Sequence, residues 1–179
     1  PIGHYVMQLP IFTSNGNGTA PNRTAAQSEL LALNDSQFLV LSRDGNGLGQ
    51  ALLNPVYKSV LLIDTTGATN IAGTPFETTT TPVAPGGVLN STITPVSQVE
   101  VVNILNTTQL GKFGININNT APTRLTLTEK MEGMALVPAL DENAPQYFFL
   151  LVANDNDFLS STCSVGGQNC AQPVNSDAL

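Results

Sequence analysis

The stretch Glu29-Leu-Leu-Ala-Leu33 returns later in the chain as Glu132-Gly-Met-Ala-Leu136, so both copies read Glu, two variable residues, then Ala-Leu. A second apolar run follows each copy, and residues 38–46 match residues 149–157. Each unit thus contains an acid, an apolar strand, a turn, a second apolar strand and a polar cluster. Repeated two-strand units joined by polar loops are typical of β-propellers. The repeat predicts an all-β propeller fold, with a small self-contained β-sandwich as the alternative.

Short strands rich in Val, Ile, Leu, Phe, Thr and Tyr are predicted along most of the chain. They are bounded by Gly, Pro, Asn or Asp, which favour turns. The expected strands are residues 4–9, 28–33, 37–43, 57–64, 99–105, 124–128, 132–137 and 147–153. Residues 103–114 are the one place where a short helix is considered. Residues 65–95 have loop composition and are interpreted as an insertion between strands, and residues 161–179 as a C-terminal tail.

A propeller blade usually has four strands, so these strands make roughly two to three blades. The smallest closed propellers have about four blades. An open stack would leave edge strands unpaired, which promotes unwanted association. Residues 1–160 are therefore predicted to be part of a larger propeller. The expected partner is the N-terminal half of the same propeller, as a separate chain or a missing segment.

Charge excludes some classes of function. The 179 residues carry 13 Asp and Glu against 6 Lys and Arg, a net charge of -7. This balance disfavours nucleic acid, whose phosphates need basic patches, and favours cations as ligands. The longest apolar run, residues 147–153, is far shorter than the roughly 20 residues that span a bilayer, so no membrane span is expected.

Two features indicate a secreted, extracellular protein. Six Asn-x-Ser/Thr sequons are candidate N-glycosylation sites, at Asn17, Asn22, Asn34, Asn90, Asn106 and Asn118. The two cysteines, Cys163 and Cys170, flank a Gly-Gly turn and are predicted to form a disulfide loop. Two free thiols or half a zinc site are the alternatives, although His4 is the only histidine available for zinc.

The chain resembles a known family in several of these motifs. Residues 129–136 and 147–158, which contain Glu-Gly-Met-Ala-Leu and Asn-Asp-Asn-Asp-Phe, look like the closing section of the secreted phytase-like β-propellers, described as "esterase-like activity of phytase". Residues 4–9, 29–44 and 57–71 fit the same family. The resemblance covers roughly residues 1–158. It implies a propeller longer than this chain, because the family's N-terminal Asp-x-Glu-Gly strand and Glu-Tyr-Gly loop are not found here.

The glutamates of the repeat are the first candidates for chemistry. In a propeller the innermost strand of each blade runs along the central channel, and an acid at its start points inward. Glu29 and Glu132 would then present carboxylate oxygens, the ligands that calcium prefers. The alternative is that each glutamate is a solvated residue at the start of a strand.

Acidic loops after the second strands are the second candidates. Asp44, Asp155 and Asp157 alternate with asparagine or glycine, which places several oxygens on one loop, as calcium sites do. Asp44 lacks a bidentate glutamate at the spacing of a complete calcium loop. The alternative for all three is an Asx-turn in which the side chain binds the local backbone.

Few residues could bind an anionic substrate. Arg43 is the candidate, because a guanidinium binds phosphate or carboxylate in a bidentate manner, and Lys58 is the other cation considered. The alternative for both is an ion pair at a strand end. His4 is interpreted as structural, and with a single histidine and no Gly-x-Ser-x-Gly motif a Ser-His-Asp triad is not expected.

Two functions remain open from the sequence. The first, implied by the family resemblance, is a secreted calcium-dependent hydrolase of phosphate or carboxylic esters, in which a bound cation polarises the ester and activates water. The second is a non-catalytic extracellular glycoprotein whose propeller serves as a binding or structural scaffold, since propellers host unrelated functions.

Overall fold

The computed structural model describes residues 3–13, 22–48, 53–78, 81–115 and 120–155, and the backbone of residues 161–165 and 168–174. The chain is all-β with several antiparallel sheets, as predicted, and has few, short helices. In chain order the elements are β1 (Ile11–Thr13), β2 (Asn22–Thr24), β3 (Ala26–Ala32), β4 (Gln37–Arg43), β5 (Lys58–Asp64), α1 (Pro75–Thr78), η2 (Pro85–Gly87), β6 (Ser97–Asn103), α2 (Thr107–Lys112), β7 (Met131–Pro138), β8 (Phe148–Asn154), β9 (Ser161–Val165) and β10 (Gln168–Val174).

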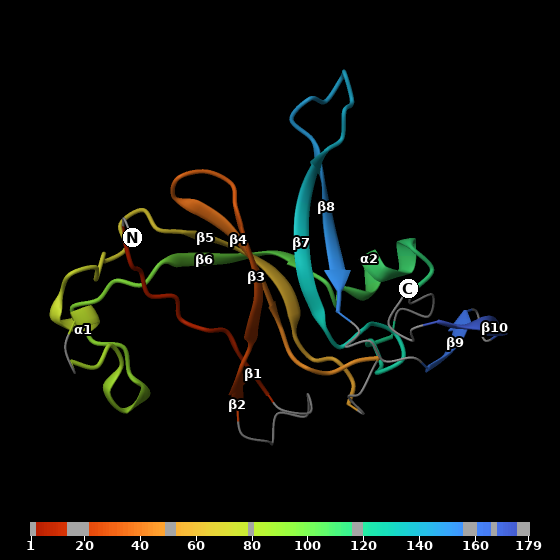
Figure 1. Ribbon diagram of the computed structural model, residues 1–179, viewed down its shortest axis with the longest axis horizontal. Helices are drawn as coiled ribbons and strands as arrows, with labels where there is room; N and C mark the ends of the chain where they lie inside the picture. The colour runs from red at the N-terminus through yellow and green to blue at the C-terminus, as the bar shows by residue number, and fades with distance from the viewer. Residues whose placement is uncertain are drawn as a thin grey trace.

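The central element is a four-stranded antiparallel sheet with the order β3-β4-β5-β6 (Figure 1). Its first turn is tight because Leu33 N donates to Gln37 O at 2.9 Å. The Asn34 side chain fixes the same turn, since its Oδ1 accepts the N–H groups of Ser36 and Gln37. Asparagine suits this position because its short side chain can replace a backbone acceptor. The turn expected between the two strands of the first repeat unit is thus confirmed at residues 33–37.

Both faces of this sheet are covered, which explains why β4 and β5 are apolar almost throughout. One face carries Leu39, Leu41 and Val60, which pack with Met131 of β7. The opposite face carries Val40, Leu61 and Ile63 with Val96 and, partly buried, Met7. The N-terminal segment and the β5–β6 connection cover this second face. The alternation follows from the register, because Leu39 pairs with Leu62 and Leu41 with Val60.

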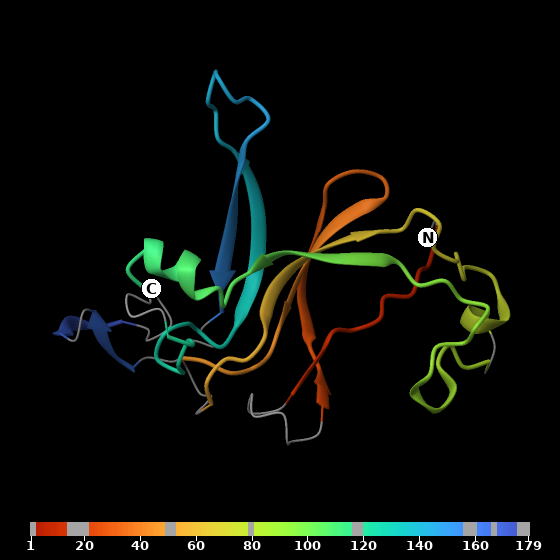
Figure 2. The same cartoon turned by 180° about the vertical axis from the view of Figure 1, so that it is seen from behind.

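The hairpin of β7 and β8 is a separate two-stranded sheet. Seen from the front and from behind, it projects from the four-stranded sheet, with its loop end pointing away (Figures 1 and 2). Its base contacts β3 and β4. Met134, Leu136 and Leu150 on one face of the hairpin join the cluster around Leu41.

The strand register corrects one expectation from the repeat. If β4 and β8 are aligned through Phe38 and Phe149, Leu41 corresponds to Val152. Glu29 pairs with Leu41, so an equivalent Glu132 would pair with Val152. Val152 instead pairs with Met134, two positions after Glu132. Both strands have a bulge here, but Glu29 follows the bulge of β3, between Gln27 and Glu29, whereas Glu132 lies within the bulge of β7, between Met131 and Gly133. The two glutamates are therefore not equivalent in the two hairpins.

The predictions of strands at residues 4–9 and 124–128 are wrong. Residues 4–9 are extended but form no strand, because their backbone contacts are scattered: Ile71 N donates to His4 O at 2.8 Å and Val96 N to Val6 O at 2.9 Å. Residues 124–128 form a turn that ends in a single parallel bridge between Leu48 and Thr128.

The bridge after β4 requires a glycine. Gly47 has a φ of 137°, and a Cβ on it would lie 2.5 Å from Leu127 O. Only glycine allows the two backbones to approach this closely. Leu48 N then donates to Leu127 O at 2.7 Å, and Glu129 N to Leu48 O at 2.9 Å. This contact ties the loop after β4 to the segment that leads into β7.

The remaining elements bear on the predicted organisation. Residues 65–96 connect β5 to β6 and hold α1 and η2, and the helix considered within residues 103–114 is α2. The tail contains the hairpin of β9 and β10. Within the described part of the chain no sheet closes into a ring, so the propeller and the boundary at residue 160 stay predictions.

Candidate functional site

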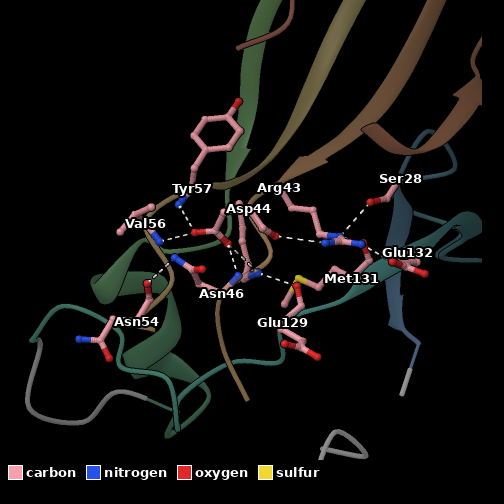
Figure 3. A network of polar contacts seen from close by, with 11 residues as sticks. Ser28, Arg43, Asp44, Asn46, Asn54, Val56, Tyr57, Glu129, Met131 and Glu132 are labelled. Atoms are coloured by element: carbon pink, nitrogen blue, oxygen red, sulfur yellow. Dashed lines mark hydrogen bonds and ion pairs between the residues drawn. The ribbon is translucent and has the colours of Figure 1, made fainter. Parts of the chain in front are cut away.

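The polar side chains of the described core gather where β4 ends. Arg43 is the last residue of β4, and Asp44 follows it directly. Figure 3 shows Asp44 between Val56 and Tyr57 on one side and the Arg43–Glu132 pair on the other. Asp44, Lys58 and Glu129 are buried although charged residues seldom are. Burial of charge at one place identifies this strand end as the candidate site.

Both carboxylate oxygens of Asp44 accept hydrogen bonds. Oδ2 accepts the backbone N–H groups of Val56 at 2.6 Å and Tyr57 at 3.1 Å. Oδ1 accepts the N–H of Asn46 at 3.2 Å and the Nζ of Lys58 at 3.1 Å. The bond to Asn46 is the Asx-turn that the sequence left open as an alternative. Asp44 thus fixes the segment that enters β5.

Lys58, the first residue of β5, is 1% exposed and pairs with Asp44, which is 2% exposed. Its Nζ also donates to Glu129 O at 2.9 Å. Burial lowers the pKa of the Lys58 ammonium, because desolvation disfavours the charged form, and the charge of Asp44 opposes this effect only in part. The pair joins the four-stranded sheet to the segment before β7.

We expect the stability of the folded chain to rise with pH in the alkaline range because of Lys58. The unfolded chain keeps this proton up to the ordinary lysine pKa of about 10.4, whereas the folded chain releases it at lower pH. The unfolded state therefore binds more protons between the two pKa values, and the free energy of unfolding increases with pH there. Urea unfolding of the wild type and of Lys58→Met across this range measures the effect. Equal slopes for both proteins would contradict it.

Arg43 connects three strands. Its Nε donates to Ser28 Oγ of β3 at 2.9 Å and to Met131 O of β7 at 3.2 Å. One terminal nitrogen forms an ion pair with Glu132. The Arg43 side chain is 11% exposed and that of Glu132 33% exposed, so the pair is partly shielded from water. Arg43 therefore holds the base of the β7–β8 hairpin against the four-stranded sheet.

A half-open cavity of about 250 Å³ lies beside this network. Its lining joins the β1–β2 hairpin to the loop after β4 and consists of Phe12, Arg23, Thr24, Ala26, Arg43, Asp44, Gly45, Asn46 and Leu53. Phe12 stacks on Tyr57 with ring centroids 6.0 Å apart and forms an apolar wall. The cavity thus combines an apolar side with two guanidinium groups.

The predicted metal ligands are not brought together in the described residues. No group of three or more His, Cys, Asp or Glu side chains suited to a metal occurs there. The carboxylate of Asp44 accepts hydrogen bonds from four donors, one of them the Lys58 ammonium. Glu132 forms an ion pair with Arg43. Glu29 Oε1 accepts the N–H of Leu30 at 2.9 Å. Asp44 and Glu132 are thus engaged by cationic side chains and do not fit calcium, which needs several available oxygens, whereas calcium at Glu29 stays a prediction. Asp155 follows β8, and its backbone N donates to Lys130 O at 2.9 Å. Asp157 lies outside the described residues, so calcium at these two positions stays a prediction.

The predicted modification sites whose side chains are described lie in loops or at the start of a helix, and the others lie outside the described residues. Asn34 is in the β3–β4 turn, Asn90 is in the β5–β6 connection, and Asn106 caps α2 by accepting the N–H of Gln109. Asn17 and Asn118 lie outside the described residues, as does the Asn22 side chain. Cys163 is in β9 and Cys170 in the paired β10, but their side chains are not described, so glycosylation and the disulfide stay predictions.

Comparison with known proteins now identifies the family. Residues 3–158 match the Phytase-like family, described as "Esterase-like activity of phytase". The chain belongs to the phytase-like family. The match includes β1 to β8 and every residue of the polar network, and it confirms the resemblance inferred from the sequence.

The chain is also similar to a fungal protein whose name describes it as secreted. A protein of Arthroderma benhamiae named "Uncharacterized secreted protein" is 32% identical over 166 residues, which cover 87% of this chain and 32% of the relative. The chain thus spans about a third of that relative's length. No solved structure matches the chain. Among the described residues, no helix has the length and apolar character needed to cross a membrane.

One residue at the cavity was not a candidate from the sequence. Arg23 is in β2 and pairs with Phe12 of β1, so its position depends on pairing between β1 and β2. Lys58 forms the strand-end ion pair that the sequence left open as an alternative, but its burial, which depends on contacts with Asp44 and Glu129, was not predicted.

Proposed function

We propose that this chain is a section of a secreted phytase-like β-propeller and that its cavity binds the anionic group of a phosphate or carboxylic ester, as part of an ester hydrolase. The observation that carries the proposal is the position of Arg23 at the cavity, next to Arg43. The family description and the secreted relative support the reaction class and the extracellular location.

The charges around the cavity favour an anion. Three of the chain's 6 Lys and Arg residues, Arg23, Arg43 and Lys58, gather here in a protein of net charge -7. Glu132 neutralises Arg43 and Asp44 neutralises Lys58. Arg23 has no carboxylate partner among the described residues, so one positive charge is left at the cavity. A guanidinium in this position suits the planar or tetrahedral oxygens of carboxylate or phosphate.

In this proposal Arg23 and Phe12 contact different parts of the ester. The Arg23 guanidinium contacts the anionic oxygens, and the apolar wall at Phe12 contacts the organic part of the ester. Asn46, whose Nδ2 donates to Asn54 O at 3.0 Å, has its amide fixed at the cavity rim. Glu132 and Asp44 are paired with Arg43 and Lys58, so the proposal assigns them no step with a metal ion.

A non-catalytic scaffold is the second candidate, and one observation favours it. Asp44 and Glu132, two of the predicted ligands, bind strands together through Lys58 and Arg43. Carboxylates engaged in this way stabilise an architecture without acting on a substrate. Binding of an anion without turnover would fit this candidate.

Replacing Arg23 by glutamine is expected to weaken binding of inorganic phosphate by tenfold or more. A hydrogen bond to a charged group contributes about 1.5–3 kcal/mol, and about 1.4 kcal/mol corresponds to a factor of ten in affinity. Isothermal titration of phosphate and of acetate measures the change. Lys112→Gln in the last turn of α2 is the matched control, because Lys112 does not line the cavity. Equal loss in both variants, or none in Arg23→Gln, would contradict the site.

Hydrolysis of a phosphate monoester and of a carboxylic ester separates the two candidates. Each ester is incubated with the purified chain, with calcium and then with a chelator. Turnover that Arg23→Gln reduces supports the hydrolase, and its loss with chelator would indicate a metal bound by residues other than Asp44 and Glu132. Phosphate binding with no turnover of either ester supports the scaffold.

A further inference from the structure

The β7–β8 hairpin has an apolar face that nothing in the described structure covers. The outer face, as we name it, consists of Ala135, Val137, Phe149, Leu151 and Ala153, all of which are exposed. The register places them on one side, because Ala135 pairs with Leu151 and Val137 with Phe149. Phe149 is 61% exposed and Leu151 54% exposed. Contiguous exposed apolar residues of this kind mark interaction surfaces.

The internal repeat shows what covers such a face in its other copy. Aligned through Phe38 and Phe149, Val40 corresponds to Leu151 and Leu41 to Val152. Val40 is 3% exposed against 54% for Leu151, and Leu41 is 0% against 38% for Val152. The sequences are equally apolar, so the difference comes from the neighbours. In the first copy β5 pairs with the edge of β4, and the face of Val40 is covered by Val96 and Ala68 of the β5–β6 connection and by Met7 of the N-terminal segment.

The edge of β8 lacks the same neighbour. In the described residues β8 pairs only with β7, whereas β4 pairs with β3 and β5. The sequence of β8, Phe-Phe-Leu-Leu-Val-Ala-Asn, contains no charge and no proline. Natural edge strands that stay unpaired usually carry charged residues or proline, which prevent pairing with another chain. This strand instead has the composition of an interior strand.

We propose that β8 is an interior strand of a larger sheet, that its free edge pairs with two antiparallel strands, the counterparts of β5 and β6, and that the segment connecting these strands covers the outer face. These strands would come from the part of a phytase-like protein that corresponds to the unmatched remainder of the Arthroderma benhamiae relative, about two thirds of its length. The inference rests on the propeller of the proposed function but not on its anion site. The contact involves the free edge of β8 and the five residues of the outer face.

Two other occupants fit less well. β9 pairs with β10 in the structure, and its sequence, Ser-Thr-Cys-Ser-Val, offers one large apolar residue for a face that contains Phe149 and Leu151. A second copy that paired β8 with β8 would extend the sheet but would bring no counterpart of the β5–β6 connection to the outer face. An apolar strand pair with such a connection satisfies both the edge and the face.

Co-expression tests the surface directly. The chain is co-secreted with the unmatched remainder of the Arthroderma benhamiae protein, and complex formation is measured by sedimentation. We expect a one-to-one complex with the wild type and at least a tenfold weaker complex with Leu151→Lys, which places a charge on the outer face. Val99→Lys is the matched control, because Val99 is 62% exposed on β6 and should not change binding. An equally strong complex with Leu151→Lys, or none with the wild type, would overturn the proposal.

Hydrogen exchange gives a second, independent reading. In this chain alone, β8 amides that do not bond to β7 should exchange at least tenfold faster than β4 amides, because exchange reports local opening and exposure. In the intact relative, the strand that aligns with β8 should exchange as slowly as the one that aligns with β4. Slow exchange of β8 in the chain alone would mean that β9 or a second copy covers it, and would overturn the proposal. If the chain does not bind phosphate, the results expected from co-expression and from hydrogen exchange stay the same, because neither depends on the anion site.

Discussion

Asp44→Asn is expected to lower the free energy of unfolding by about 3 kcal/mol or more. The change removes the charge that compensates the ammonium of Lys58, which is 1% exposed, and leaves a buried charge without its partner. Breaking one side of a buried pair typically costs about 3–5 kcal/mol, more than the pair itself contributes. The backbone bonds from Val56 and Tyr57 can persist to the amide oxygen, whereas the NH2 group that replaces Oδ1 cannot accept from Lys58 or Asn46, so the loss includes these two hydrogen bonds. Urea unfolding followed by circular dichroism measures it.

Two controls make this prediction specific. Asp35→Asn, on the exposed β3–β4 turn, should change stability by less than about 0.5 kcal/mol. Asp44→Asn combined with Lys58→Met should recover part of the loss, because it removes the uncompensated charge as well. If Asp44→Asn is as stable as Asp35→Asn, the pair is not the link between β4 and β5 that the geometry indicates.

Leu41→Ala is the second large effect expected, a loss of about 2–5 kcal/mol. Leu41 is 0% exposed and packs with Leu39, Val60 and Met131. The truncation removes buried methyl groups and leaves a cavity between the four-stranded sheet and β7. Because Met131 begins β7, the variant should also accelerate hydrogen exchange in the β7–β8 hairpin.

The matched control is Leu30→Ala in the neighbouring strand. Leu30 is 57% exposed, so its truncation should cost less than about 1 kcal/mol. Thermal and urea unfolding of both variants give the comparison. A Leu41→Ala protein that unfolds at the wild-type midpoint would mean that the cluster around Leu41 does not carry the core.

Strands with local signals were predicted well from the sequence. Residues 37–43 were predicted with the bounds of β4, and the predictions for β7 and β8 differ from the structure by one residue at each end. Alternating or continuous β-branched and aromatic residues, bounded by turn residues, contain this information. Residues 4–9 have a similar pattern but form no strand. Their backbone partners, at Ile71 and Val96, lie on separate segments and cannot form one ladder.

The candidate site was predicted in part. The sequence located Arg43 and Asp44 at the end of a strand and left open that both are structural, and the ion pairs with Glu132 and Lys58 support this alternative. It wrongly treated Glu29 and Glu132 as equivalent. The repeat aligns them by spacing, but Glu29 follows the bulge in β3 and pairs with Leu41, whereas Glu132 lies within the bulge in β7. A bulge depends on backbone pairing, which a single sequence does not reveal.

The sequence by itself determined the family, the all-β class and the tight turn at residues 33–37, because short-range pattern and turn chemistry fix these features. Tertiary structure decided which charges are buried and which are available. Lys58 is buried because Glu129, far along the chain, lies against β5, and Arg23 reaches the cavity because β1 pairs with β2. The electrostatics of a side chain depend on solvent exposure and on neighbours distant in sequence, and only the folded arrangement sets both.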